Sequence, residues 1–168
     1  MEARNQRKLG HEDRSDCAVT PDRVRAWGRE LRRVHQALRQ QIDDIRSDDR
    51  PRDELAADLR MFCLGFCAAL SRHHTAEDGA LFPRIVADHP ELGPVVDRLM
   101  QDHALLGYLI ADLEAVPADA EHAEIQRHLD GIEAIMESHF AYEERQLVAV
   151  LDAMTTADTD VGRLLGTD

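Results

Sequence analysis

The chain has 168 residues, of which 43% are hydrophobic and 32% charged, and its formal net charge is −13. This length and composition fit one soluble globular domain. The acidic balance argues against a nucleic-acid binder or an anionic-membrane binder, because both need a basic face. Aromatic residues make up only 4%, which leaves little for stacking bases. The chain also has nine histidines, and such an accumulation raises the question of metal or proton chemistry.

Residues 1–19 are polar and lack hydrophobic periodicity, so we predict a flexible tail followed by one domain over 20–168. Thr20-Pro21-Asp22 is typical of a helix start, with a cap, a proline and an acidic first turn. Pro83 is expected to kink the second helix or to end its regular part. No strand-like alternation occurs and the loops are short, which favours an all-α, antiparallel up-down four-helix bundle. The predicted helices cover 21–46, 52–88, 94–115 and 118–153, and a short fifth helix could occupy about 158–165.

Cys17, Cys63 and Cys67 are too few, and odd in number, for a disulfide framework. We interpret Cys63 and Cys67 as buried thiols on one helix face rather than as a redox pair. No signal peptide is visible, and no apolar run approaches the roughly 18–20 residues of a membrane span. We therefore expect a cytoplasmic protein.

Each of the four main helices carries one histidine on the apolar face that it must bury, at 100° per residue. These histidines are His35, His73, His103 and His139. Glu77 and Glu143 follow two of them by one helical turn, on the same face. The apolar residues assigned to these faces include Leu31, Leu38, Phe66, Leu70, Leu99, Met100, Ile132 and Met136.

The histidines form an internal repeat. His35 precedes His73 by 38 residues, His103 precedes His139 by 36, and each half ends in HxxxE. A single such histidine is more often a hydrogen-bonded core residue, and chance supplies about one HxxxE pair in a chain of this composition. The metal prediction therefore depends on the whole set of four histidines and two glutamates. Two buried carboxylates without a cation would cost several kcal/mol each. Four imidazoles and two carboxylates suit a pair of divalent iron or manganese ions, so the sequence predicts a dinuclear metal site.

Other metal and catalytic motifs do not fit. HExxH is absent, as are a glycine-rich phosphate loop and G-x-S-x-G. Ferritin-like di-iron proteins use Glu-x-x-His, and none of the nine histidines has a glutamate three residues before it.

Over about residues 20–153 the chain resembles the hemerythrin-like family, the HHE cation-binding domain. The resemblance rests on the order H…HxxxE…H…HxxxE, in the segments His35, His73-xxx-Glu77 with Leu81-Phe82-Pro83, Asp102-His103 and His139-xxx-Glu143-Glu144. It implies a non-haem centre of two iron ions, bridged by both glutamates and by an oxo, hydroxo or water ligand. The implied ligands are His35, His73, Glu77, His103, His139 and Glu143.

The chain departs from the oxygen-carrying hemerythrins that it resembles. Those proteins use five histidines, two of them four residues apart on the third helix, but here Gly107 stands four residues after His103. The last carboxylate is Glu143, four residues after His139, where the carriers have an aspartate at the fifth. One iron is therefore expected to have a missing or a different ligand. An extra open position would favour turnover of peroxide or nitric oxide over reversible oxygen storage.

Several neighbouring residues have two readings. We interpret His74 as an edge residue, with a supporting role or a fifth ligand as the alternative. Arg39 is interpreted as a snorkelling edge residue rather than a peroxide-binding group. Tyr142 is expected to pack in the core, with a hydrogen bond to a ligand as the alternative. Gly107 leaves room for a diatomic molecule or permits close helix approach. Of the remaining histidines, His128 lies on the apolar stripe but too far from His139 to bind the same metal. The other three are expected in the tail or in loops: His11, His89 and His122.

Four functions stay open: an enzyme that decomposes peroxide (catalase-like) or reduces nitric oxide, a carrier or sensor of oxygen or nitric oxide, an iron-handling protein, and an oxidase of an organic substrate. A sensor would usually carry an output domain, and no polar constellation defines an organic substrate. We therefore favour the first. The expected partner is a peroxide or diatomic ligand, with no nucleic acid or membrane, and the electron donor is not identified.

Overall fold

A computed structural model describes residues 27–47, 52–117, 120–154 and 161–167, and only the backbone of 52–63, 122 and 161–162. All regular elements in these ranges are helical. The predicted tail and the helix start at Thr20 lie outside them, as do His11, Cys17 and the side chains of Cys63 and His122. The elements are α2 (Trp27–Arg46), α3 (Arg52–Ala76), the π-helical turn η1 (Glu77–Leu81), α4 (Phe82–Asp88), the 3₁₀ turn η2 (Pro90–Leu92), α5 (Gly93–Glu114), α6 (His122–Ala153) and α7 (Val161–Leu165).

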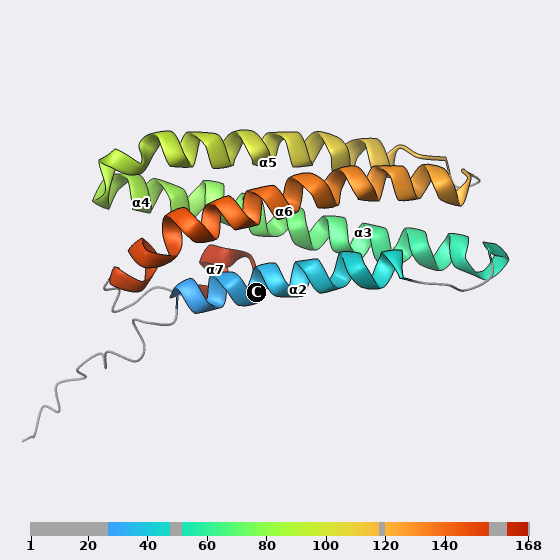
Figure 1. Cartoon of the computed structure of the whole chain (residues 1–168), viewed down its shortest axis with the longest axis horizontal. Helices are drawn as coiled ribbons and strands as arrows, with labels where there is room; N and C mark the ends of the chain where they lie inside the picture. Colours follow the sequence, from blue (N-terminus) through green and yellow to red (C-terminus); the bar gives the residue numbers. More distant parts are fainter. Residues whose placement is uncertain (1–26, 48–51, 118–119, 155–160, 168) are drawn as a thin grey trace, which may run out of the picture.

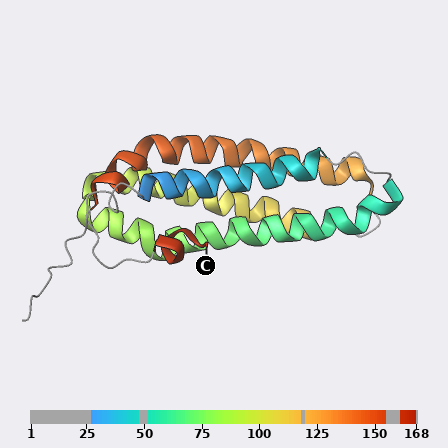
Figure 2. The ribbon, with the colours of Figure 1, turned by 90° about the horizontal axis from the view of Figure 1, so that it is seen from below.

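The four long helical segments form the predicted antiparallel bundle (Figure 1). α2 packs against α3 and α6, and α5 packs against α6 and against the α3–α4 segment, so each segment has two neighbours around a common core. α7 lies against α2, α3 and η1, on the outside of the bundle (Figure 2). Among the described helices, none is long and apolar enough to cross a membrane.

The apolar faces are buried largely as the periodicity predicts. Leu31, Leu70, Leu99 and Ile132 are fully inaccessible to solvent, and Cys67 is buried as well. Met100 is an exception, since it is 42% exposed although it was assigned to the buried face. The buried residues of α5 recur every three or four positions, at Val96, Leu99, His103, Leu106 and Ile110. Met100 lies on the opposite side of His103 from Leu99, beyond the edge of this stripe.

The second helix contains a π-helical turn, Glu77–Leu81, shortly before Pro83. The Phe82 N–H donates to the Glu77 carbonyl, five residues back instead of four. A proline ring collides with the carbonyl four residues before it, and a wider turn relieves that collision. The expected disturbance at Pro83 therefore takes the form of a π turn that begins at Glu77, and the helical path continues to Asp88. π turns are frequent at functional sites.

Candidate metal centre

Seven buried side chains meet in the middle of the bundle. The ligand atoms of His35, His73, Glu77 and Glu143 all lie within 4.8 Å of one another, and those of His74, His103 and His139 form a second such group. None of the seven residues is more than 6% exposed. The structure thus brings together all six residues predicted from the sequence and adds His74.

The two glutamates of the first group lie between its histidines and those of the second group. One Glu77 oxygen is 3.4 Å from His73 Nε2 and the other is 3.6 Å from His103 Nε2. Glu143 Oε2 lies 3.2 Å from His35 Nε2 and 3.8 Å from His139 Nε2. Each carboxylate therefore faces a histidine of both groups, which is the placement that a bridging ligand needs.

Two pairs of imidazole nitrogens face each other across the centre. The Nε2 atoms of His35 and His73 are 3.2 Å apart, and those of His103 and His139 are 3.0 Å apart. Nitrogen donors about 2.1 Å from one ion, at right angles around it, lie about 3 Å from each other. The spacing of both pairs is therefore that of two ligands on one ion.

Polar atoms without hydrogen-bond partners concentrate at this centre. All four oxygens of Glu77 and Glu143 are buried and unpartnered, as are His74 Nε2 and His139 Nδ1. A buried polar group without a partner costs about 1–3 kcal/mol, and a charged one costs more. Native proteins keep few such atoms, so six in one place indicate an ion that binds them. The donor set of imidazoles and carboxylates fits divalent transition metals.

Two groups of the centre, His35 and Glu77, have raised pKa values and so bind protons more readily than usual. Burial opposes the charged form of His35, but the attraction of Glu143, 3.2 Å away, and the hydrogen bond to Glu144 outweigh it and raise the pKa of His35. Burial works against the charged form of Glu143 too, yet the His35 contacts lower its pKa to about 2. Glu77 has no such partner, and burial together with the Glu143 charge raises its pKa well above the usual value. In the metal-free protein, protons on His35 and Glu77 thus take the place of metal charge.

The other central histidines are held neutral. Burial, together with neighbouring imidazoles, lowers the pKa of His73 to about 4 and that of His139 to about 3, and it also lowers the pKa of His74. A neutral imidazole has a free lone pair, which is the form that binds metal. These three side chains are therefore ready to bind an ion at neutral pH without first losing a proton.

Acidic side chains orient two of the imidazoles from outside. The Nδ1 of His35 donates to Glu144 Oε1 over 2.9 Å, and the Nδ1 of His103 donates to Asp78 Oδ1 over 2.8 Å. A donor bond from Nδ1 fixes the tautomer and directs Nε2 toward the metal position. Glu144 and Asp78 are the residues directly after the two central glutamates, so the repeat in the sequence extends to this supporting contact.

Arg39 acts through Glu144. Its guanidinium donates to Glu144 over 3.1 Å and to Glu137 over 2.9 Å, and it lies over the Phe140 ring. Its reading as a snorkelling edge residue is therefore incomplete, because it holds the carboxylate that orients His35. Its contacts with Glu137, Glu144 and the Phe140 ring place it outside the centre.

His74 is buried rather than an edge residue, and its ring stacks on that of His103 with a 4.0 Å centroid separation. The edge interpretation came from measuring angles from His73. Measured from Glu77, His73 lies about 40° to one side and His74 about 60° to the other, so one helix face presents all three. Glu77 lies at the centre of this face, so angles measured from Glu77 place His74 on the face from the sequence alone.

The repeat breaks at one position. Phe140 follows His139 as His74 follows His73, and its ring stacks on His35 with a 3.8 Å centroid separation, as His74 stacks on His103. A phenyl ring cannot ligate. The centre is therefore asymmetric, with two histidines in the group that contains the glutamates and three in the other.

Three other expectations can be compared with the structure. Tyr142 packs partly buried against the core, between the guanidinium groups of Arg98 and Arg145, as the core-packing reading predicts. Gly107 is exposed, and a Cβ there would meet no atom within 4 Å, so neither reading of Gly107 holds. His128 is partly buried on α6 and belongs to neither ligand group.

The Glu144 contact predicts a loss of metal affinity. Glu144→Ala removes the acceptor for His35 Nδ1, and loss of such a partner typically costs 10–100-fold in affinity. We expect a loss in that range in competition with a chromogenic chelator. Glu137→Ala is the matched control, because Glu137 also pairs with Arg39, whereas the acceptor for His35 Nδ1 is Glu144. An equal loss in both variants would mean that Arg39, rather than the orientation of His35, controls affinity.

The chain was also compared with known proteins. The family described as the hemerythrin HHE cation binding domain matches residues 29–151. Neither the comparison with curated proteins nor that with solved structures gave a match. The matched range spans the four long helices and contains all seven residues of the two ligand groups. The chain therefore belongs to the hemerythrin HHE cation-binding domain family.

Proposed function

We propose that the protein holds two iron ions in this centre and uses them to react with a small oxygen or nitrogen species, foremost hydrogen peroxide. His35 and His73 would hold one ion, His74, His103 and His139 the other, and Glu77 and Glu143 both. When bound, the pair supplies redox change and open positions for a small molecule. The seven ligands are the observation that carries the proposal.

The donor count supports a reactive centre. Five imidazoles and two carboxylates offer at most five nitrogen and four oxygen donors. Two six-coordinate ions have about twelve positions, so the protein cannot fill both. The positions left over are available to an oxo, hydroxo or water bridge and to a small molecule. The shortage falls on the two-histidine group, where Phe140 stands in the place that His74 fills in the other group.

Burial restricts what can react. The seven ligands are nearly inaccessible, and the residues around them are apolar or engaged in ion pairs. A molecule the size of peroxide, oxygen or nitric oxide can reach such a centre through small fluctuations. An organic substrate would need a pocket that opens onto the ligands, and of the seven residues only His73 lines the neighbouring cavity. The proposal is therefore a catalase-like decomposition of two peroxide molecules to two water molecules and one oxygen molecule. Nitric oxide reduction is the related reaction, and it needs an external electron donor.

A reversible carrier or sensor is the second candidate, and His74 favours it. The sequence predicts a missing or a different ligand on one iron, and His74 offers a different one as a fifth imidazole. The centre therefore has as many histidines as the oxygen carriers, although the fifth comes from a different helix. An iron-handling protein would use the same ligands without turnover.

Oxygen release from peroxide tests the proposal. We expect the iron-loaded protein to evolve oxygen rapidly from hydrogen peroxide in a Clark-electrode assay, and the metal-free protein not to. His73→Ala should abolish this activity, while His128→Ala should leave it unchanged. Equal oxygen evolution with and without metal would overturn the proposal. An oxygenated form that is stable for hours and releases intact oxygen would establish the carrier instead.

A further inference from the structure

The short C-terminal helix α7 reaches the metal centre from outside the family-matched range, which ends at residue 151. It packs against α2, α3 and η1, and its residues Leu164 and Leu165 are buried. A five-residue helix has too few internal hydrogen bonds to be stable alone, so these tertiary contacts hold it in place.

The residues at the end of α7 contact a central histidine directly. The Leu165 carbonyl accepts a hydrogen bond of 3.0 Å from His73 Nδ1, and both residues are about 1% exposed. This bond places the proton on Nδ1 and leaves the lone pair on Nε2, which faces His35 Nε2. His35 and His103 obtain the same orientation from carboxylates within the bundle, but His73 obtains it from a backbone carbonyl of the C-terminal segment.

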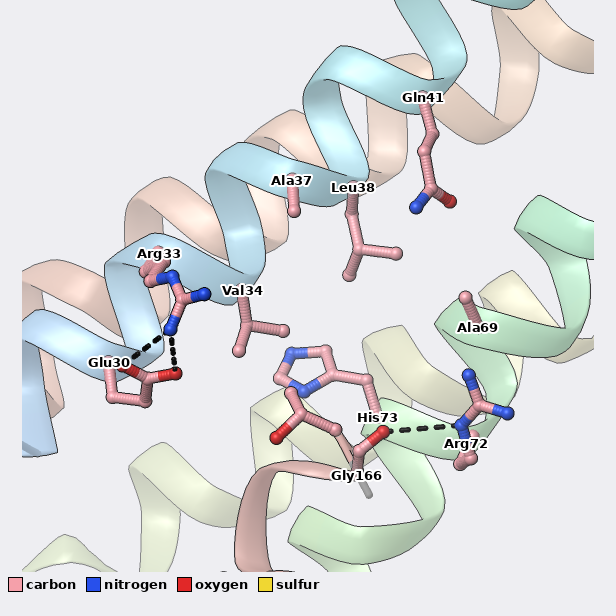
Figure 3. Close-up of a pocket in the computed structure, with 11 residues that line it drawn as sticks. Glu30, Arg33, Val34, Ala37, Leu38, Gln41, Ala69, Arg72, His73 and Gly166 are labelled. Atoms are coloured by element: carbon pink, nitrogen blue, oxygen red, sulfur yellow. Dashed lines mark hydrogen bonds and ion pairs between the residues drawn. The ribbon is translucent and has the colours of Figure 1, made fainter. Parts of the chain in front are cut away.

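The next residue shows how closely the segment is fitted. Gly166 has a φ of +67°, and a Cβ added to it would lie 2.5 Å from the Arg72 carbonyl oxygen. Only glycine can both adopt this conformation and pass so near to the backbone of α3. The Gly166 carbonyl also accepts a hydrogen bond of 3.2 Å from Arg72 Nε (Figure 3). The two neighbours of Leu165 are thus both held in place, Leu164 by burial and Gly166 by its contacts with Arg72.

A cavity lies beside this contact. It has a volume of about 380 Å³ and is lined by α2, by α3 and by Gly166 and Thr167, with His73 in its wall (Figure 3). His73 Nδ1 is bonded to the Leu165 carbonyl, and His73 Nε2 points to the centre. The C-terminal segment therefore keeps solvent in the cavity from reaching Nδ1. If the segment moved away, solvent would replace the carbonyl as the partner of Nδ1.

We propose that the segment Val161–Thr167 is a working part of the metal centre, in which the Leu165 carbonyl positions His73 and Gly166 makes that contact possible. His73 is a ligand, and Leu165 is a positioning residue that acts through it. The proposal rests on metal binding at the seven-residue centre, but not on the identity of the metal or on peroxide as the substrate.

Gly166→Ala tests the proposal, because it adds a Cβ where none fits. The first measurement is the rate at which the loaded protein loses metal to excess EDTA. We expect about half of the bound metal, that of the His35–His73 group, to leave 10–100-fold faster than from the unmodified protein. Gly131→Ala is the matched control, since Gly131 lies within α6 and a Cβ there meets no atom within 4 Å. It should release metal at the unmodified rate.

The second measurement needs no metal and separates this proposal from the proposed function. Long-range ¹H–¹⁵N NMR of the metal-free protein should show His73 with its proton on Nδ1. Gly166→Ala should give a mixture of tautomers at His73 and leave His103 unchanged. If Gly166→Ala does not fold, Arg72→Ala removes the bond to Gly166 from the exposed side and should shift both measurements in the same direction, by less. Unchanged metal loss and an unchanged His73 tautomer in the folded variant would overturn the proposal, even if its melting temperature fell.

Discussion

Replacing Glu77 by glutamine is expected to stabilise the metal-free protein and, at the same time, to remove tight metal binding. The Glu77 carboxyl is fully buried, both of its oxygens lack a partner, and its pKa is raised well above the usual value. Glutamine has the same shape without the cost of keeping a proton on a buried carboxyl at neutral pH. We expect a gain of about 1–3 kcal/mol in the free energy of unfolding of the metal-free form, measured with urea.

Glu143→Gln should have the opposite effect on the metal-free protein. Glu143 and Glu144 raise the pKa of His35, and His35 lowers that of Glu143, so His35 and Glu143 form a buried ion pair. Removing one member leaves a buried charge uncompensated, which costs about 3–5 kcal/mol. Both variants should lose metal, because each removes a carboxylate that faces both groups. Two variants of like chemistry with opposite effects on stability would be hard to explain by a general disturbance of the core.

The stability difference between Glu77→Gln and the unmodified metal-free protein should grow with pH. A folded-state pKa above the unfolded value means that the native state binds the extra proton, so Glu77 contributes stability near pH 4.5 that is lost as pH rises. His73, His74 and His139, whose pKa values are lowered, have the opposite dependence, and His35, whose pKa is raised, has the same one. All four histidines are present in both proteins, so their contributions cancel in the comparison. Urea titrations at pH 5, 6 and 7 measure this. A difference that is constant or shrinks with pH would contradict the assignment of the proton to Glu77.

The sequence alone predicts most of this fold for a simple reason. Helix faces are set by a period of 3.6 residues, and prolines at 90 and 94 mark where helices begin, so the long elements can be placed to within a few residues. The six predicted ligand residues follow from the same geometry, because the helical period places one histidine on the buried face of each long helix and a glutamate one turn after two of them. Met100 shows what helix periodicity cannot predict. It lies at the edge of the apolar stripe of α5, where the position of the neighbouring helices determines whether a residue is buried, and it is exposed.

Contacts between distant segments could not be read in this way. The Leu165 carbonyl reaches His73 from 92 positions along the chain, and nothing in the pattern around Leu165 marks its backbone as a partner. The π turn at Glu77 similarly depends on how the backbone accommodates Pro83, where the sequence predicted only a disturbance. His74 is different, since its position beside the bridging glutamate was present in the sequence, and only the choice of reference angle hid it.

His74→Phe provides the sharpest test of the asymmetric centre, because the protein already contains the substituted arrangement. Phe140 holds the equivalent place in the other half and stacks on His35 in the way that His74 stacks on His103, so phenylalanine should fit at position 74 without a cavity. It would leave two histidines in each half and remove one donor from the group of His103 and His139. Loss of a direct ligand should exceed the 10–100-fold cost of losing a supporting contact, so we expect metal content after dialysis to fall from two ions per chain to about one. His128→Phe is the control on a histidine of α6 outside the centre, and it should retain both ions. If His74→Phe also retained both ions with an unchanged optical spectrum, the buried lone pair of His74 Nε2 would not be a ligand, and the missing-ligand prediction from the sequence would be correct after all.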